Sequence, residues 1–174
     1  RNNLKIFSFT TLLYTFLFIV SFIPSFLFSL GFWFSITAVF YIFLYIRYFQ
    51  NLNSYFSFIF FNIWIFLIFN PIVHYYFPQT SFEQLYSVFI TIFFTLFYPV
   101  EIVLHLFDIA IYFDDFIKIF LNHKIEVFEV KTSIYFLVIY IVFSFLSIRK
   151  KEFFIVLNIL MLIFNFYLLL ELNN

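Results

Sequence analysis

The chain has no cysteine, one glycine and two alanines, and only 10% of its 174 residues are charged. The absence of cysteine excludes disulfides, iron–sulfur clusters and thiolate zinc sites. The net charge is zero and no basic run is longer than residues 149–151, so we expect no nucleic acid partner. No nucleotide-binding loop, nucleophile elbow or metalloprotease helix is present, and therefore neither a cofactor nor a metal site is predicted.

Apolar residues dominate the chain. Hydrophobic residues make up 66% of it, against roughly 45–50% in ordinary soluble domains. Such a chain has too little polar surface to face water, so the lipid bilayer, together with other subunits of a large membrane complex, is its expected surroundings. The sequence predicts an all-α, multi-span transmembrane helical protein that forms a single membrane domain over residues 1–174.

Uncharged stretches set the predicted spans. No charge occurs from Ile6 to Ile46, which at about 1.5 Å per residue covers roughly twice the ~30 Å hydrocarbon thickness. Two spans are therefore expected there, with a break near Pro24. The third span is expected to end around Pro71, because proline disfavours helix continuation. In all, five to six spans are predicted, at about residues 6–23, 27–47, 55–74, 83–100, 133–148 and 153–171.

Between the fourth and fifth spans, ionisable groups recur at a regular spacing. Intervals of four, three, seven and seven residues place five polar side chains on one stripe of a helix: Glu101, His105, Asp108, Asp115 and Asn122. A charge at the bilayer centre costs roughly 2.5–3.5 kcal/mol, which favours an amphipathic interfacial helix over about residues 101–122. The alternative is a proton-handling face formed by Glu101, His105 and Asp108, because intramembrane ionisable groups often mark proton paths.

Other polar residues carry weaker hypotheses. His74 is interpreted either as a quinone or haem contact in a broken helix or, preferably, as the polar terminus of a helix stopped by proline. Arg47 is expected to snorkel to the membrane interface. The charged turn of Arg149, Lys150 and Lys151 is a candidate site for lipids such as cardiolipin. Because small residues are scarce, the helices are expected to pack through aromatic side chains.

Basic residues also give an expected arrangement across the membrane. With the interfacial helix lying flat, Arg47 and Lys131 fall on one side and residues 149–151 on the other. The chain begins with Arg1 and shows no short apolar run followed by a small-residue cleavage site. Its start is therefore not predicted to be a signal peptide.

The balance of residue types resembles that of proteins encoded in very AT-rich mitochondrial genomes, such as those of ciliates. The chain holds 36 Phe and 13 Tyr, and Phe, Ile, Tyr and Asn are encoded by codons rich in A and T. Lysine codons are A-rich as well, yet lysine is scarce, as selection for membrane insertion would require. This resemblance implies a multi-pass protein of the mitochondrial inner membrane.

A second resemblance lies in the C-terminal hairpin. The stretch FLSIRKKEFFIVLNILMLIFNFYLLL, residues 145–170, resembles the first loop and second helix of the smallest core membrane subunit of respiratory complex I. Leu160, Met161 and Asn165 match that family's pattern, whereas Ile159 stands where its proton-relay carboxylate would be. The stretch SFIPSFLFSLGF, residues 21–32, is similar to the broken-helix segment of antiporter-like complex I subunits, with Phe32 in place of their lysine.

These resemblances imply a membrane subunit of a mitochondrial respiratory complex. The membrane arm of complex I (NADH:ubiquinone oxidoreductase) is the leading candidate, with a largely structural role and at most a minor part in proton translocation. The first alternative is a structural membrane subunit of ATP synthase or cytochrome c oxidase. The second is a small membrane protein or transporter fragment of another role.

Overall fold

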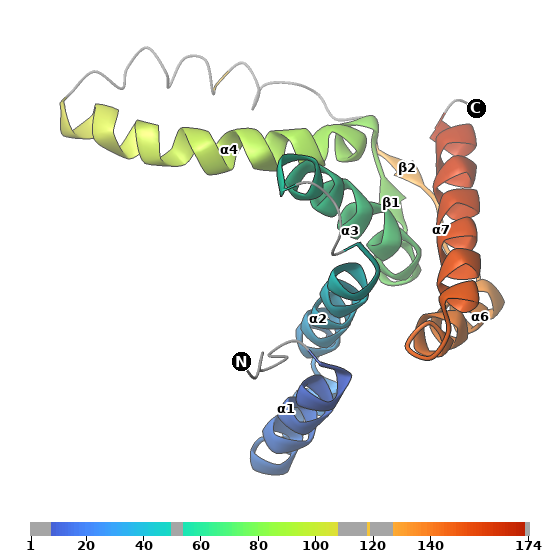
Figure 1. Cartoon of the computed structure of the whole chain (residues 1–174). Helices are drawn as coiled ribbons and strands as arrows, with labels where there is room; N and C mark the ends of the chain where they lie inside the picture. The colour runs from blue at the N-terminus through green and yellow to red at the C-terminus, as the bar shows by residue number, and fades with distance from the viewer. Residues whose placement is uncertain (1–7, 50–53, 108–117, 119–126, 173–174) are drawn as a thin grey trace.

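The computed structural model describes residues 8–49, 54–107, 118 and 127–172. Nearly all of them lie in helices (Figure 1). In chain order the elements are α1 (Phe9–Phe22), the 3₁₀ helix η1 (Pro24–Phe28), α2 (Leu30–Phe49), α3 (Ser54–Tyr76), β1 (Gln79–Thr80), α4 (Phe82–Leu106), β2 (Phe128–Glu129), α6 (Ile134–Leu146) and α7 (Lys151–Leu172).

The first two long helices form an antiparallel pair. Pro24 opens η1, at a position where its missing N–H would have no partner in any case. The chain then returns along α1, because the ring of Phe9 lies 6.4 Å from that of Phe40 and the ring of Phe16 lies 5.8 Å from that of Phe32. The break between α1 and α2 therefore lies where the only proline of this uncharged stretch occurs.

The buried core lies among α2, α3, α6 and α7. Side chains at most 1% exposed come from all four of these helices and include Tyr41, Leu44, Ile68, Tyr140 and Leu157. Helix α1 buries none of its side chains, and α4 projects away from the other helices (Figure 1). Aromatic rings do much of the packing, as the scarcity of small residues predicts.

In the part of the chain that the structure describes, four helices are long and apolar enough to cross a membrane. They are α2, α3 over Ile59–Tyr76, α4 over Phe89–Leu106, and α7 over Lys151–Glu171. Helices α1 and α6 are apolar, but their 14 and 13 residues rise only about 20 Å, against a hydrocarbon core of ~30 Å. The helical class is confirmed, with these four helices as candidate spans, while the expected count of five to six spans is not confirmed.

Three details differ from the expected pattern. Helix α3 continues through Pro71 to Tyr76, and α4 continues through Pro99 to Leu106. Residues 101–106 therefore belong to α4 and do not begin a separate interfacial helix; residues 108–117 and 119–122 of that predicted helix lie outside the described residues. A two-stranded antiparallel ladder, β1 with β2, interrupts the otherwise helical fold.

Contacts at two places fix which helix ends lie together. At one end β1 pairs with β2, and the N–H of Thr132 donates to the carbonyl of His74 (3.2 Å), so the start of α6 lies beside the end of α3. At the other end the Tyr48 hydroxyl donates to the Ser147 carbonyl (2.5 Å), and its ring stacks on Phe154 (4.1 Å). The end of α2 therefore lies beside the α6–α7 turn.

Among the described residues, four exposed positive side chains share that second end, which we call the cationic end: Arg47, Arg149, Lys150 and Lys151. Lys131 follows β2 and lies at the opposite end. Arg47 and Lys131, which were expected on one side of the membrane, therefore lie at opposite ends of the bundle. The reason is that β1, which precedes α4, pairs with β2, so the chain leaves the bundle and returns to it at the same end. Clustering of cations at one end is the pattern that the positive-inside rule associates with the side that is not translocated.

Single cysteines test this arrangement directly, because the native chain has none. In sealed vesicles of one orientation, Arg47→Cys and Lys150→Cys are expected to react with an impermeant maleimide from the same side. Lys131→Cys is expected to react only after the opposite face is opened. Reaction of Lys131→Cys and Lys150→Cys from one side would contradict the pairing of helix ends.

Candidate functional site

A buried polar cluster surrounds the proline in α3. Pro71 has no N–H, so the carbonyl of Leu67, four residues earlier, loses its partner within the helix and is crowded by the proline ring. Asn165 of α7 donates its side-chain amide to the Leu67 carbonyl (3.0 Å), and the Tyr140 hydroxyl of α6 donates to the Ile68 carbonyl (2.8 Å). Asn165 thus replaces the hydrogen bond that proline removes, and Tyr140 adds a second bond at the next carbonyl.

Asn165 uses its whole amide in this cluster. Its nitrogen also donates to the Met161 carbonyl (2.8 Å), and its oxygen accepts from the Asn70 side-chain amide (2.7 Å). Asn70 and Asn165 are 6% and 8% exposed. Because an unpaired amide in an apolar interior costs free energy comparable to a lost hydrogen bond, this arrangement holds α3 and α7 in one relative position.

His74 lies one turn beyond the cluster and is 1% exposed. Its Nδ1 lies 2.9 Å from the carbonyl of Asn70, which accepts a hydrogen bond from it, so in the neutral ring Nε2 is an acceptor. Nε2 and the Thr132 hydroxyl are both buried without a hydrogen-bond partner in the described structure. His74 is therefore a buried residue in the last turn of α3. The helix ends two residues after it, as a polar terminus would require, but it runs through Pro71 and is not stopped there.

Further polar pairs join the same helices. The indole of Trp64 donates to the Asn158 side chain (2.8 Å), linking α3 to α7. The hydroxyls of Tyr41 and Ser144 lie 3.1 Å apart, linking α2 to α6. Bonds of this kind are typical of membrane helix interfaces, where small-residue packing is the other common device. In this chain they act as specific links inside an otherwise aromatic core.

The structure brings together two of the three residues of the predicted proton-handling face. Glu101 and His105 lie one turn apart in α4, with His105 Nε2 3.3 Å from Glu101 Oε1. The His105 side chain is 60% exposed and that of Glu101 12%. Asp108, the third member, lies outside the described residues, as do Asp115 and Asn122. The pair on α4 lies on the helix that projects from the bundle and shares no described hydrogen bond with the Pro71 cluster.

The described residues contain no group of three His, Asp or Glu side chains that could hold a metal ion. The described arrangement provides hydrogen bonds that hold helices together, and it leaves acceptor atoms at His74 Nε2 and on the Glu101 carboxylate. Sequence reasoning named Asn165 only through a family resemblance and did not find the Pro71 cluster. The one indication of the Pro71 cluster in the sequence is the pair Asn158 and Asn165, two polar residues two turns apart in an apolar helix.

No protein-family profile, no curated protein and no solved structure matches this chain.

Proposed function

We propose that this chain is a largely structural membrane subunit of a mitochondrial respiratory complex, with the membrane arm of complex I as the leading candidate. Its composition and the resemblance of residues 145–170 support the proposal. One observation favours a structural over a proton-carrying role. On α7, Asn158 and Asn165 are both engaged in bonds to α3, while Ile159, in the place of the family's carboxylate, is 50% exposed on the outer surface.

The outer surface also fits a subunit of a larger assembly. Large apolar side chains are exposed along all the long helices, and α4 presents several from Phe89 to Leu106. Contiguous apolar patches of this extent are covered by lipid or by other subunits. We propose a multi-pass protein of the inner membrane with α1 and α6 crossing beside α2, α3 and α7, and with α4 in contact with partner subunits.

Comigration tests this proposal. The chain, tagged in mitochondria or detected by mass spectrometry, is expected to migrate on a native gel with complex I and to show NADH dehydrogenase activity in the same band. Migration with ATP synthase or cytochrome c oxidase would favour the structural alternative in those complexes. Migration as a small free species would overturn the subunit proposal and favour the small membrane protein or transporter fragment.

Variants of the chain in the same complex distinguish a structural role from a proton-carrying role. If the pair on α4 only faces headgroups or a partner, Glu101→Gln combined with Asp108→Asn is expected to leave both assembly and proton pumping unchanged. The matched substitution Glu152→Gln, at the cationic end, serves as the control for loss of a carboxylate. Loss of pumping in an assembled complex would instead establish Glu101, His105 and Asp108 as a proton path.

A further inference from the structure

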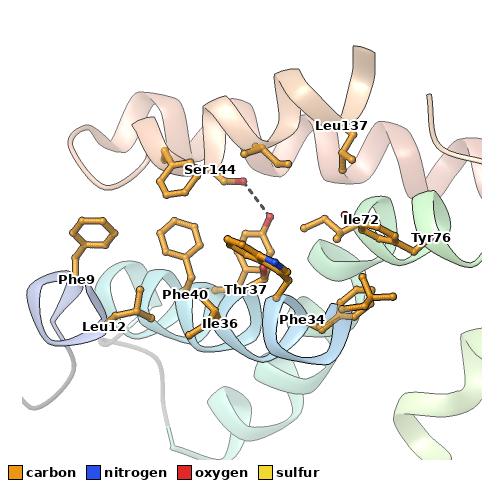
Figure 2. A pocket seen from close by; sticks show the side chains of 15 residues that line it. Phe9, Leu12, Phe34, Ile36, Thr37, Phe40, Ile72, Tyr76, Leu137 and Ser144 are labelled. Atoms are coloured by element: carbon orange, nitrogen blue, oxygen red, sulfur yellow. Dashed lines mark hydrogen bonds between the residues drawn. The ribbon is translucent and has the colours of Figure 1, made fainter. Parts of the chain in front are cut away.

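An apolar crevice of about 240 Å³ lies between the α1–α2 pair and the helices α3 and α6 (Figure 2). Its walls come from Ile36, Phe40, Ile72, Leu137 and Ile141, among others, and the Tyr41–Ser144 hydrogen bond crosses one side. Along α2 it extends from Leu30 to Tyr41, which at 1.5 Å per residue is about 16 Å. That length matches one leaflet of a hydrocarbon core ~30 Å thick.

The shape and lining of the crevice indicate its occupant. About 240 Å³ spread along about 16 Å of apolar wall suits a single hydrocarbon chain. Apolar cavities of this kind stay dry and take apolar ligands. Ile141 and Phe145 at its rim are 38% and 56% exposed, so the crevice is open to the bilayer.

Charge lies at one end of the crevice. Phe40 and Phe145, whose rings are 5.4 Å apart, line the crevice toward the cationic end. Arg47 follows Phe40 by seven residues and continues the stripe of α2 that lines the crevice. Arg149 lies in the α6–α7 turn, three residues past the end of α6 and four past Phe145. Arg47 also lies over the ring of Phe43 at 6.0 Å. Both arginines therefore follow the apolar walls along the chain at the cationic end, on the side where a lipid phosphate would lie.

We propose that the crevice binds one acyl chain of an anionic phospholipid whose phosphate is held at the cationic end by Arg47 and Arg149. Lys150 and Lys151 add positive charge at the same end. Cations near a membrane surface attract anionic lipids, whereas a zwitterionic lipid gains little from them. The proposal extends the candidate lipid site at residues 149–151 by an acyl-chain pocket and by Arg47, and it does not depend on which complex holds the chain.

Photolabelling of the full chain in phosphatidylcholine vesicles tests the site. The probes are trace phosphatidylglycerol and trace phosphatidylcholine that carry the same diazirine acyl chain, and mass spectrometry reads the labelled residues. The phosphatidylglycerol probe is expected to label Thr37 and Leu137 at least about fivefold more than the phosphatidylcholine probe. Equal labelling by the two probes would overturn the role of the cationic end.

Matched variants distinguish the contribution of the cationic end from that of the apolar crevice. Arg47→Gln with Arg149→Gln is expected to lower phosphatidylglycerol labelling to the phosphatidylcholine level, Arg→Lys at both positions to retain it, and Lys131→Gln at the opposite end to leave it unchanged. A Lys131→Gln effect equal to that of the arginine pair would overturn the proposal.

Filling the crevice provides the second comparison. Ile141→Trp is expected to abolish labelling of Thr37 and Leu137 by both probes, because the larger side chain occupies the acyl position. Ile139→Trp places the same side chain on the same helix at a residue that is 49% exposed and does not line the crevice, and labelling is expected to persist. Equal labelling in the two tryptophan variants would overturn the acyl-chain pocket.

Discussion

Replacing Asn165 by leucine is expected to destabilise the bundle by roughly 1–3 kcal/mol. The substitution keeps the size of the side chain but leaves the Leu67 carbonyl and the Asn70 amide without partners in an apolar interior. Measured interhelical hydrogen bonds in membranes average about 0.6 kcal/mol and reach about 1.7. Two such links are lost here. The measurement is the free energy of unfolding in mixed micelles titrated with a denaturing detergent.

A double-mutant cycle with Pro71→Ala tests the cause. Alanine restores an N–H at position 71, so the Leu67 carbonyl regains its partner within α3, and Asn165→Leu is expected to cost about 1 kcal/mol less in this background. Asn158→Leu is the matched control on α7, because Asn158 bonds Trp64 and no carbonyl freed by proline. Its cost is expected to be equal in both backgrounds. An Asn165→Leu cost independent of residue 71 would rule out the role we assign to this amide.

The helical class follows from composition because any long backbone segment in hydrocarbon must satisfy its own polar groups. The uncharged stretches between charged turns therefore indicate helices, and the short link at residues 149–151 indicates the α6–α7 hairpin. Helix ends are less well determined by this reasoning. Helix α1 ends just before Pro24, and α6 ends at the turn around Ser147. Single residues therefore set the lengths of these two helices.

Continuation of α3 through Pro71 could not be predicted from the local sequence. The rule that proline ends a helix assumes that the freed carbonyl meets no other donor. Here Asn165 donates to it from 98 residues away, and Tyr140 donates to the next carbonyl from 72 residues away. The same holds for the pairing of helix ends, which depends on contacts between Tyr48 and Ser147, 99 residues apart. Spacing within one helix carries no information about such partners.

The predicted proton-handling face illustrates a different limit. Helical spacing correctly places His105 one turn from Glu101, since both lie in α4. Spacing does not reveal whether that helix crosses the membrane or lies at its boundary, and α4 is apolar enough over Phe89–Leu106 to be a candidate span. The role of Glu101 and His105 thus depends on what covers α4 in the assembled complex, which the native gel and the pumping measurement address.

Trp64→Ala is expected to be the most damaging single truncation in the core. Trp64 is 2% exposed, and its ring lies 5.6 Å from Tyr45, 5.7 Å from Phe49 and 6.0 Å from Phe154. Truncating a buried tryptophan costs roughly 3–5 kcal/mol in water-soluble proteins. Lipid replaces water as the surroundings of the unpacked helices, so we expect the loss of packing to lower the free energy of unfolding by about 2–3 kcal/mol.

The other tryptophan of the chain provides the control. Trp33 on α2 is 44% exposed and donates to the Leu27 carbonyl, so Trp33→Ala is expected to cost less than about 1 kcal/mol. Trp64→Phe keeps most of the ring contacts but leaves Asn158 Oδ1 without its indole donor, and its expected cost lies between the two alanine variants. Equal destabilisation by Trp33→Ala and Trp64→Ala would show that the aromatic cluster around Trp64 does not hold α2, α3 and α7 together.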